Sequence, residues 1–207
     1  MPSTSFDPRA GLQAVPRATK ILIAGGFGVG KTTLVGAVSE VQPLRTEEVL
    51  TEVSVGIDNV DLVQGKSTTT VAMDFGRITI TDALVLYLFG TPGQQRFLFV
   101  WDELALGALG AVVLADTRRL RDSFPSIDYF EERDIPFVVG VNCFDGAQRY
   151  NTEEVRGALA LDVDVPVILC DARDRSSVKN VLIALLRHAQ TVAKQRREAA
   201  GSPTIPA

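Results

Sequence analysis

The chain has 207 residues, 46% hydrophobic and 22% charged, which is typical of a globular domain and excludes disorder over the whole length. Acidic residues outnumber basic ones by 25 to 21, so the net charge of −4 argues against a nucleic-acid-binding protein that uses a basic face. The two cysteines do not suggest a disulfide framework, which fits a cytoplasmic location. The longest uncharged apolar run, 104–115, is about half of the roughly 20 residues that a membrane span requires, so direct membrane insertion is not expected.

Both ends of the chain are rich in Ser, Thr, Pro and Ala. We expect residues 1–18 and 199–207 to be flexible tails, because these residue types form turns and loops rather than a packed core. Residues 19–198 are then expected to form one domain.

Within this domain, apolar runs alternate with amphipathic stretches. The apolar runs predict strands over 20–24, 70–79, 84–89, 111–115, 137–141 and 165–169. The strands 70–79 and 84–89 are expected to form a hairpin that turns at Thr81-Asp82. The clearest helix is the last, where apolar residues recur at helical spacing over 178–192; Ser176 or Ser177 can cap its start, and the basic residues Lys194, Arg196 and Arg197 lie at its C-terminal end. His188 lies in this helix and has no evident partner, so a surface or packing role is expected. Alternating strands and helices predict a doubly wound α/β fold, an open three-layer sandwich.

The first strand leads into a glycine-rich loop. Residues 25–32, GGFGVGKT, match G-x-x-x-x-G-K-[ST], with an apolar strand before the motif and a helix-like stretch after it. The glycines let backbone N–H groups converge on phosphate, Lys31 is expected to reach the β- and γ-phosphates, and the Thr32 hydroxyl to bind Mg²⁺. The predicted phosphate-binding residues are Gly25, Gly28, Val29, Gly30, Lys31, Thr32, Thr33 and Gly93.

Two later loops indicate the base. Asn142–Asp145 resembles the N-K-x-D guanine motif of small GTPases, with Cys143 in place of the lysine. The Asp145 carboxylate can accept from guanine N1–H and N2–H₂, a donor pair that adenine lacks, and Asn142 is expected to tie this loop to the phosphate loop. Cys170–Arg173 resembles the S-A-K loop, whose Ala172 N–H is expected to donate to guanine O6. The predicted guanine-binding residues are Asn142, Cys143, Asp145, Ala172 and Arg173.

Residues 90–94, GTPGQ, follow the strand 84–89, where small GTPases carry D-x-x-G-Q. Gly93 is expected to place its N–H on the γ-phosphate, and Gln94 to orient the attacking water, with Gln94 and Lys31 as the catalytic residues. Gly90 stands where the usual aspartate would be.

A bacterial branch of the Ras-like small GTPases shares this departure. The gliding-motility and polarity GTPases carry T-x-P-G-Q here and an aspartate four residues after the switch-I threonine, as in Thr70–Asp74. The stretch 66–76 resembles most closely the ATP/GTP-binding proteins of actinobacterial conservon operons, and the resemblance covers about 18–195. It implies a Ras-like G domain with a six-stranded, mostly parallel sheet and about five helices.

By this resemblance Thr70, with Thr69 as the nearest alternative, binds Mg²⁺ and the γ-phosphate, and Asp74 supports the metal indirectly. The motility branch tends to have an arginine finger where this chain has Thr69, and such a finger contributes roughly 10³ to 10⁵ in rate, so hydrolysis of GTP to GDP is expected to be slow. The implied role is a regulatory switch in the cytoplasm. Implied partners are a roadblock-type protein and a membrane sensor-kinase-like complex that recruits the chain peripherally.

Several alternatives stay open. Two functions are alternatives to a GTPase switch: a GTP-binding scaffold with little or no hydrolysis, and an ATP-using P-loop protein. Asp116, directly after an apolar strand, either serves as a Walker B-type aspartate or simply leads into a polar loop with a solvated arginine cluster. The aromatic residues Phe97, Phe99 and Trp101 either form a partner face or pack against the sheet.

Overall fold

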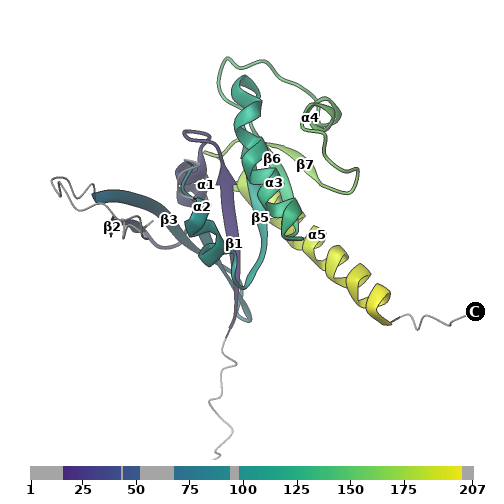
Figure 1. Cartoon of the computed structure of the whole chain (residues 1–207), viewed down its shortest axis with the longest axis horizontal. Coiled ribbons are helices and arrows are strands. Elements are labelled where there is room, and N and C mark those ends of the chain that lie inside the picture. Colours follow the sequence, from purple (N-terminus) through teal and green to yellow (C-terminus); the bar gives the residue numbers. More distant parts are fainter. Residues whose placement is uncertain (1–15, 43, 52–67, 94–97, 202–207) are drawn as a thin grey trace, which may run out of the picture.

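A sheet with seven strands among the described residues organises the molecule (Figure 1). The computed structural model describes residues 16–42, 44–51, 68–93 and 98–201. The sheet order is β2-β3-β4-β1-β5-β6-β7, and β3 alone runs against the other strands. The strands are β1 (Arg17–Gly25), β2 (Leu44–Thr51), β3 (Thr68–Thr81), β4 (Leu84–Gly90), β5 (Ala108–Ala115), β6 (Phe137–Asn142) and β7 (Val167–Cys170).

The predicted α/β class and mostly parallel sheet are confirmed, but the sheet has seven strands rather than six. The additional strand is β2, which pairs antiparallel with β3 at the edge of the sheet. Its sequence, LRTEEVLT, contains Arg45, Glu47 and Glu48, so it has no apolar run that would mark it as a strand. Charged side chains are common on edge strands because one edge of such a strand is unpaired.

Helices cover both faces of the sheet. They are α1 (Lys31–Val38), α2 (Leu98–Ala105), α3 (Phe124–Glu132), α4 (Thr152–Ala158) and α5 (Arg175–Gly201), with a 3₁₀ segment, η2 (Thr117–Ser123), before α3. This agrees with the expected number of about five helices. No helix in the described part of the chain combines the length and apolar character that a bilayer crossing requires.

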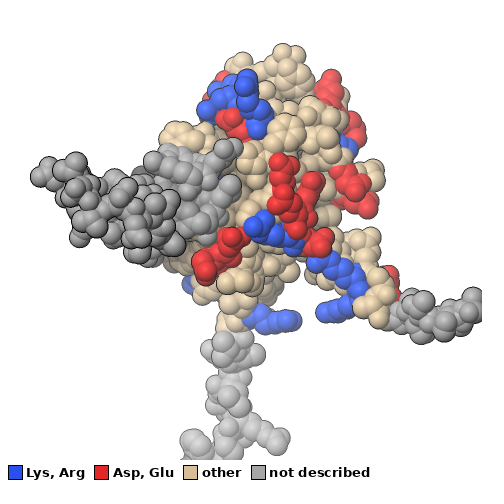
Figure 2. Space-filling view, viewed as in Figure 1, with Lys and Arg blue, Asp and Glu red and all other residues tan. Residues whose placement is uncertain are grey.

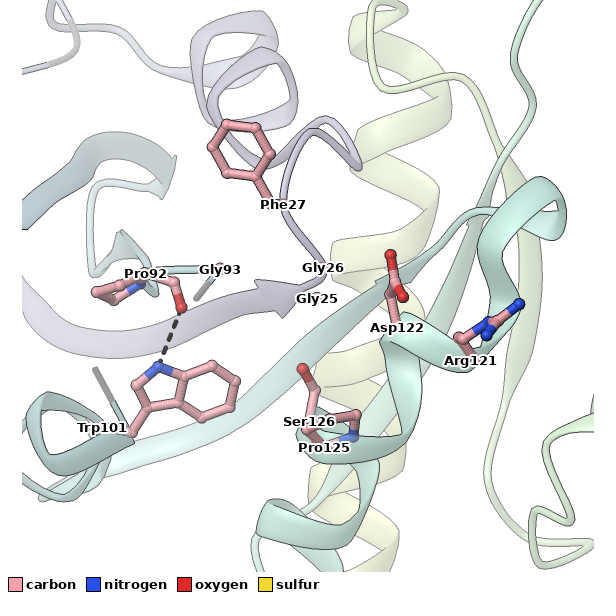
Figure 3. Close-up of a pocket in the computed structure, with 10 residues that line it drawn as sticks. All are labelled: Gly25, Gly26, Phe27, Pro92, Gly93, Trp101, Arg121, Asp122, Pro125 and Ser126. Carbon is pink, nitrogen blue, oxygen red and sulfur yellow. Dashed lines mark hydrogen bonds between the residues drawn. The ribbon is translucent and has the colours of Figure 1, made fainter. Parts of the chain in front are cut away.

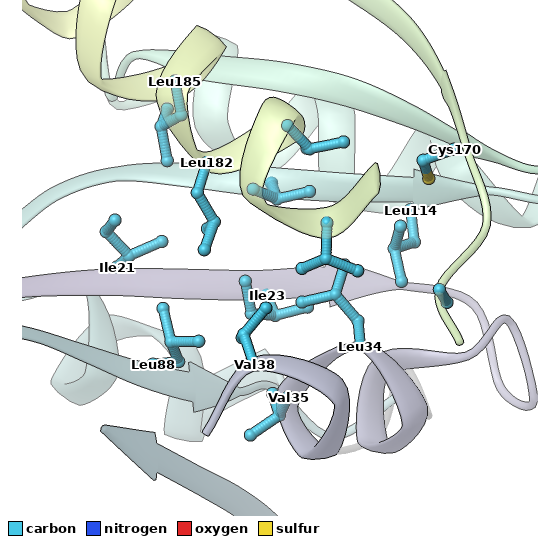
Figure 4. Close-up of a cluster of buried hydrophobic side chains, with 14 of the residues drawn as sticks. Ile21, Ile23, Leu34, Val35, Val38, Leu88, Leu114, Cys170, Leu182 and Leu185 are labelled. Atoms are coloured by element: carbon cyan, nitrogen blue, oxygen red, sulfur yellow. The ribbon is translucent and has the colours of Figure 1, made fainter. Parts of the chain in front are cut away.

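Alternation along β1 produces the three layers. Ile21 and Ile23 face a core beneath α1 and α5, which Figure 4 shows, whereas Leu22 and Ala24 face a second core beneath α2, α3 and α4. Successive side chains of a strand point to opposite faces, so a strand that is apolar at every position needs cover on both sides. All four side chains are fully buried.

The last helix is longer than predicted. Its buried residues end at Ala189, but α5 continues to Gly201, past the predicted domain boundary at 198. At the other end β1 starts at Arg17, which pairs with Leu84, slightly before the predicted boundary at 19. Residues 1–15 and 202–207, most of the predicted tails, lie outside the described residues.

The parallel strands β1, β4, β5, β6 and β7 all end at one edge of the sheet. Ligands of open α/β sheets bind at this carboxyl edge, beside the strand where the connections change direction. Here β1 lies between β4 and β5, so the loop after β1 is at the centre of that edge. The predicted motifs follow β1, β4, β6 and β7, and are therefore brought to one end of the molecule.

Candidate functional site

The loop between β1 and α1 turns sharply on its glycines. Gly25, Gly28 and Gly30 have φ of 130°, 73° and 108°, values that side-chain-bearing residues rarely adopt. A Cβ at Gly30 would lie 2.7 Å from Asn142 Nδ2, so no side chain fits there. Helix α1 starts directly after Gly30 with no side-chain cap and no acidic residue in its first turn. Its free N–H groups and positive dipole end are therefore available to an anion.

Lys31 lies across this loop. Its Nζ donates to the carbonyl oxygens of Gly25 at 2.8 Å and Gly26 at 2.9 Å. Burial lowers the pKa of the Lys31 ammonium to about 8, and the charge of Asp74 opposes this shift. A Cβ at Gly93 would lie 2.7 Å from Nζ, so the loop after β4 meets the phosphate loop at this lysine. A bound phosphate would stabilise the charged form of Lys31.

Thr32, at the start of α1, contacts Asp74 from β3. The Thr32 hydroxyl donates to Asp74 Oδ2 at 2.6 Å, and Asp74 is in register with Gly90 of β4. A Cβ at Gly90 would lie 3.0 Å from the Cβ of Asp74 and 3.1 Å from its Oδ2. Asp74 therefore occupies the space beside the residue where small GTPases would carry the switch-II aspartate.

A third polar side chain at this place has no partner. Thr91 is 2% exposed, and its hydroxyl has no hydrogen-bond partner among the described residues. Leaving a buried hydroxyl unpaired costs about 1–3 kcal/mol. Thr91 lines a cavity of about 470 Å³ together with Lys31, Thr32, Asp74 and Gly93. Hydroxyl and carboxylate oxygens suit Mg²⁺, which also keeps water ligands, so this donor set fits the predicted metal.

A second cavity, of about 350 Å³, lies on the other side of the phosphate loop. All five predicted guanine-binding residues line it, together with residues of the phosphate loop and of the η2 region: Gly28, Gly30, Thr33, Arg118, Asn142, Cys143, Phe144, Asp145, Asp171, Ala172 and Arg173. Gly28, Gly30 and Thr33 also line the first cavity, so the two cavities adjoin along the phosphate loop.

Asn142 joins three loops. Its Nδ2 donates to Val29 O at 2.9 Å, which ties the end of β6 to the phosphate loop as the sequence predicts. Its Oδ1 accepts from the backbone N–H of Ala172 at 3.1 Å. The amide that was expected to donate to guanine O6 therefore donates to Asn142 in this structure.

The Asp145 carboxylate is held by Arg173. Arg173 Nη1 donates to Asp145 Oδ2 at 2.6 Å and Nη2 to Oδ1 at 3.0 Å. The same guanidinium donates to both oxygens of Asp171, at 2.9 and 2.8 Å. These bonds lower the pKa of the Asp145 carboxyl and lower that of Asp171 to about 2. Both carboxylates therefore stay charged at neutral pH.

Sequence reasoning missed Arg118 and Phe144 among the residues that line the second cavity. The Arg118 guanidinium stacks 3.8 Å from the centre of the Phe144 ring. Arg118 also donates to both oxygens of Asp116, which is 3% exposed and caps the start of η2. Asp116 is thus engaged by Arg118, as expected if it leads into a polar loop. Figure 2 shows basic side chains gathered at the top of the molecule, the end towards which β1 runs.

A third cavity, of about 330 Å³, lies between the phosphate loop, the loop after β4, and α3 (Figure 3). Trp101 forms one wall, is 3% exposed, and donates from Nε1 to Pro92 O at 3.2 Å. Of the two alternatives for the aromatic residues, packing is therefore correct for Trp101. Phe97 and the side chain of Phe99 lie outside the described part. Phe27, at the tip of the phosphate loop, is 70% exposed.

Gln94, the predicted water-orienting residue, lies outside the described residues. Thr70 lies in β3 opposite Val49, but its side chain is not among those described. His188 is half-buried in α5, and burial lowers its pKa.

The fold and the phosphate loop define a nucleotide-binding P-loop protein with a G-domain fold. The structure is similar to the cytosolic domain of the T. maritima FeoB iron transporter in GDP form, with a TM-score of 0.61 and 17% identity, covering 84% of this chain and 64% of that one. It is also similar to the FeoB G-domain from Methanococcus jannaschii, with a TM-score of 0.56 and 14% identity, covering 84% and 99%. The chain thus spans nearly two thirds of the FeoB cytosolic domain and almost all of the isolated G domain.

The sequence comparison gives the family. Residues 23–192 match the family described as conserved hypothetical ATP binding protein, and the chain belongs to this family. It is also 30% identical over 128 residues to the uncharacterized protein MJ1339 of Methanocaldococcus jannaschii. The aligned segment covers 61% of this chain and 70% of that protein.

Proposed function

We propose that the chain binds GTP and GDP with Mg²⁺, hydrolyses GTP slowly, and acts as a regulatory switch for a partner complex. The observation that carries this proposal is the pair of adjoining cavities that share Gly28, Gly30 and Thr33. One presents Lys31 and the N-terminus of α1 to phosphates, and the other presents Asp145 to a base. A nucleotide has the same two parts in the same order.

The base is proposed to be guanine. Guanine offers N1–H and N2–H₂ to the two oxygens of Asp145, whereas adenine would leave this charged acceptor without the donor pair. The family description names ATP, which favours the ATP-using alternative. Asp145 supports guanine over adenine, because adenine lacks the adjacent pair of N–H donors that a carboxylate at this position would accept.

Mg²⁺ is proposed to be held by Thr32, with Asp74 positioning it indirectly and Thr70 reaching it in the GTP form. Held by these residues, Mg²⁺ would supply positive charge that stabilises the negative charge of the phosphates during hydrolysis. Thr32 and Asp74 are 2.6 Å apart, oxygen to oxygen, which supports a shared role. The buried hydroxyl of Thr91, which has no hydrogen-bond partner among the described residues, would gain one from a phosphate oxygen or a bound water.

Hydrolysis is proposed to use Gln94 to orient water, Lys31 to hold the β- and γ-phosphates, and the Gly93 N–H to contact the γ-phosphate. Position 69 is a threonine, whereas the gliding-motility branch tends to have an arginine finger there, so the rate without a partner is expected to be low. By resemblance to the conservon and gliding-motility branch, a roadblock-type protein and a membrane sensor-kinase-like complex are the proposed partners. Recruitment by that complex would place a cytoplasmic chain at the membrane periphery.

Calorimetric titration of the full chain with GDP, GTP and ATP, each with Mg²⁺, tests the base. Wild type is compared with Asp145→Ala and with Asp128→Ala, an exposed aspartate on α3. We expect Asp145→Ala to weaken GDP binding at least about tenfold and Asp128→Ala to leave it unchanged. ATP binding that equals GTP binding and does not depend on Asp145 would establish the ATP-using alternative instead.

Phosphate release from GTP then tests the reaction. Gln94→Ala is compared with Gln190→Ala, which alters an exposed glutamine of α5. Slow release that is lost in Gln94→Ala supports a GTPase. Tight guanine binding with no release from wild type would favour the scaffold alternative.

A further inference from the structure

The second cavity, which is the proposed base cavity, already contains a group with the shape of the guanine edge. The N1–C2–N2 edge of guanine is part of a guanidine unit, with two N–H donors side by side. The Arg173 guanidinium presents the same pattern to the same two oxygens of Asp145, at 2.6 and 3.0 Å. Planar, bidentate pairing of this kind is characteristic of arginine with carboxylates. Arg173 and guanine therefore cannot occupy Asp145 together.

Arg173 has a second carboxylate to hold it. Its Nε and Nη2 donate to Asp171 at 2.9 and 2.8 Å, and its backbone N–H donates to Asp171 Oδ1 at 2.9 Å. The side chain can therefore leave Asp145 without losing every charged partner. Asp171 follows β7 directly, so it keeps the arginine beside the cavity when the contact with Asp145 is broken.

Exposure makes this exchange accessible. The side chain of Arg173 is 57% exposed and that of Asp145 79% exposed, so neither is trapped in a core. Exposed ion pairs contribute little to stability, because water and dissolved salt screen the charges, and bidentate geometry makes such a pair stronger than a single contact. A ligand with two well-placed donors can displace such a pair, but its apparent affinity is reduced by the fraction of molecules in which the site is closed.

We propose that Arg173 is an internal competitor of the guanine base: its guanidinium occupies Asp145 in the nucleotide-free protein, and it keeps only its contacts with Asp171 when guanine binds. This inference rests on the proposed guanine-binding function. Arg173 lowers the affinity for guanine nucleotides, whereas it leaves unchanged the affinity for ligands that use only the phosphate loop. Arg173 thereby keeps the binding of guanine nucleotides weaker and more readily reversible than Asp145 without this competitor would make it.

The test measures GDP and inorganic pyrophosphate binding to the full chain, with Mg²⁺, by calorimetry. Pyrophosphate serves as the diphosphate without a base. In Arg173→Ala we expect GDP to bind about fivefold more tightly than to wild type, the factor that corresponds to an exposed bidentate pair, with pyrophosphate binding unchanged. Arg173→Lys, a point charge that cannot pair bidentately, should lie between the two.

Asp171→Asn separates competition from a general change in the loop. Asparagine keeps the acceptor for the Arg173 backbone N–H but loses the charge that draws the side chain away from Asp145. We expect GDP binding to weaken in Asp171→Asn, and this loss to disappear in the double variant Arg173→Ala/Asp171→Asn. Thermal unfolding of each variant identifies any loss of folded protein.

Two results would overturn the inference. If GDP binding depends on Asp145 but Arg173→Ala binds GDP no more tightly than wild type, Arg173 does not compete, and the guanine proposal stands without it. If neither wild type nor Arg173→Ala binds GDP in an Asp145-dependent manner, the proposed function fails, and the inference fails with it.

Discussion

Asp74 of β3 lies in register with Gly90 of β4, and its carboxylate accepts a hydrogen bond from the Thr32 hydroxyl at 2.6 Å. A side chain at position 90 would press against Asp74, because its Cβ would be 3.0 Å from that of Asp74. The position of the Asp74 side chain therefore requires a residue without a side chain at position 90. An acidic group reaches the start of α1 from the neighbouring antiparallel strand rather than from the end of β4.

This arrangement predicts a magnesium-dependent defect in Asp74→Asn. We expect Mg²⁺ to support GDP binding about tenfold less well, as is typical when a group that orients a metal ligand is lost. Binding measured in EDTA should change little. Asp82→Asn, in the exposed turn between β3 and β4, is the control. An equal loss with and without Mg²⁺ would show that Asp74 acts on the loop and not on the ion.

Asn142→Ala should destabilise the protein as well as weaken binding. The substitution leaves the Ala172 N–H and the Val29 carbonyl without their partner, and unpaired buried groups cost about 1–3 kcal/mol. The free energy of unfolding, measured with urea in the absence of nucleotide, should fall by that amount. Asn180→Ala, on the exposed side of α5, should not change it. Unchanged stability of Asn142→Ala would mean that water replaces both contacts.

Thiol alkylation at pH 8 should report on the base cavity. Cys143 is half-buried and lines that cavity, whereas burial raises the pKa of the Cys170 thiol to about 12, so Cys170 stays protonated and unreactive. We expect one thiol to react in the folded chain, and GDP with Mg²⁺ to slow that reaction. Cys143→Ser should abolish it. A reaction rate that GDP does not alter would place the base away from Cys143.

Trp101 is the only tryptophan of the chain and is hydrogen bonded to Pro92, next to Gly93. If Gly93 contacts the γ-phosphate, this loop should shift between the GDP and GTP forms, and Trp101 emission should differ between GDP and a non-hydrolysable GTP analogue. Excitation at the long-wavelength edge of the tryptophan band selects Trp101, because tyrosine and phenylalanine absorb very little there. Identical spectra at saturation would contradict a switch that works through this loop.

The contiguous parts of the site were predictable. Residues 25–32 form a phosphate loop because glycines, lysine and threonine at that spacing, between a strand and a helix, determine the local backbone. The chain order of strands also placed Asn142–Asp145 and Cys170–Arg173 correctly at one edge, since parallel strands joined by crossovers end on the same side. The edge strand β2 was not predictable, because its charges conceal the strand pattern.

The amino-acid sequence by itself determined the α/β class, the carboxyl-edge location of the site and most of the residues that line the two adjoining cavities, although not Arg118 or Phe144. Those features depend on local spacing and on the order of apolar runs. The tertiary structure alone decided which polar groups pair: Asp74 with Thr32, Ala172 with Asn142, Arg118 with Asp116 and Phe144, and Arg173 with Asp145. Hydrogen bonds and ion pairs require approach within a few ångströms, and for groups on separate loops only the packing of the sheet and its helices sets that distance.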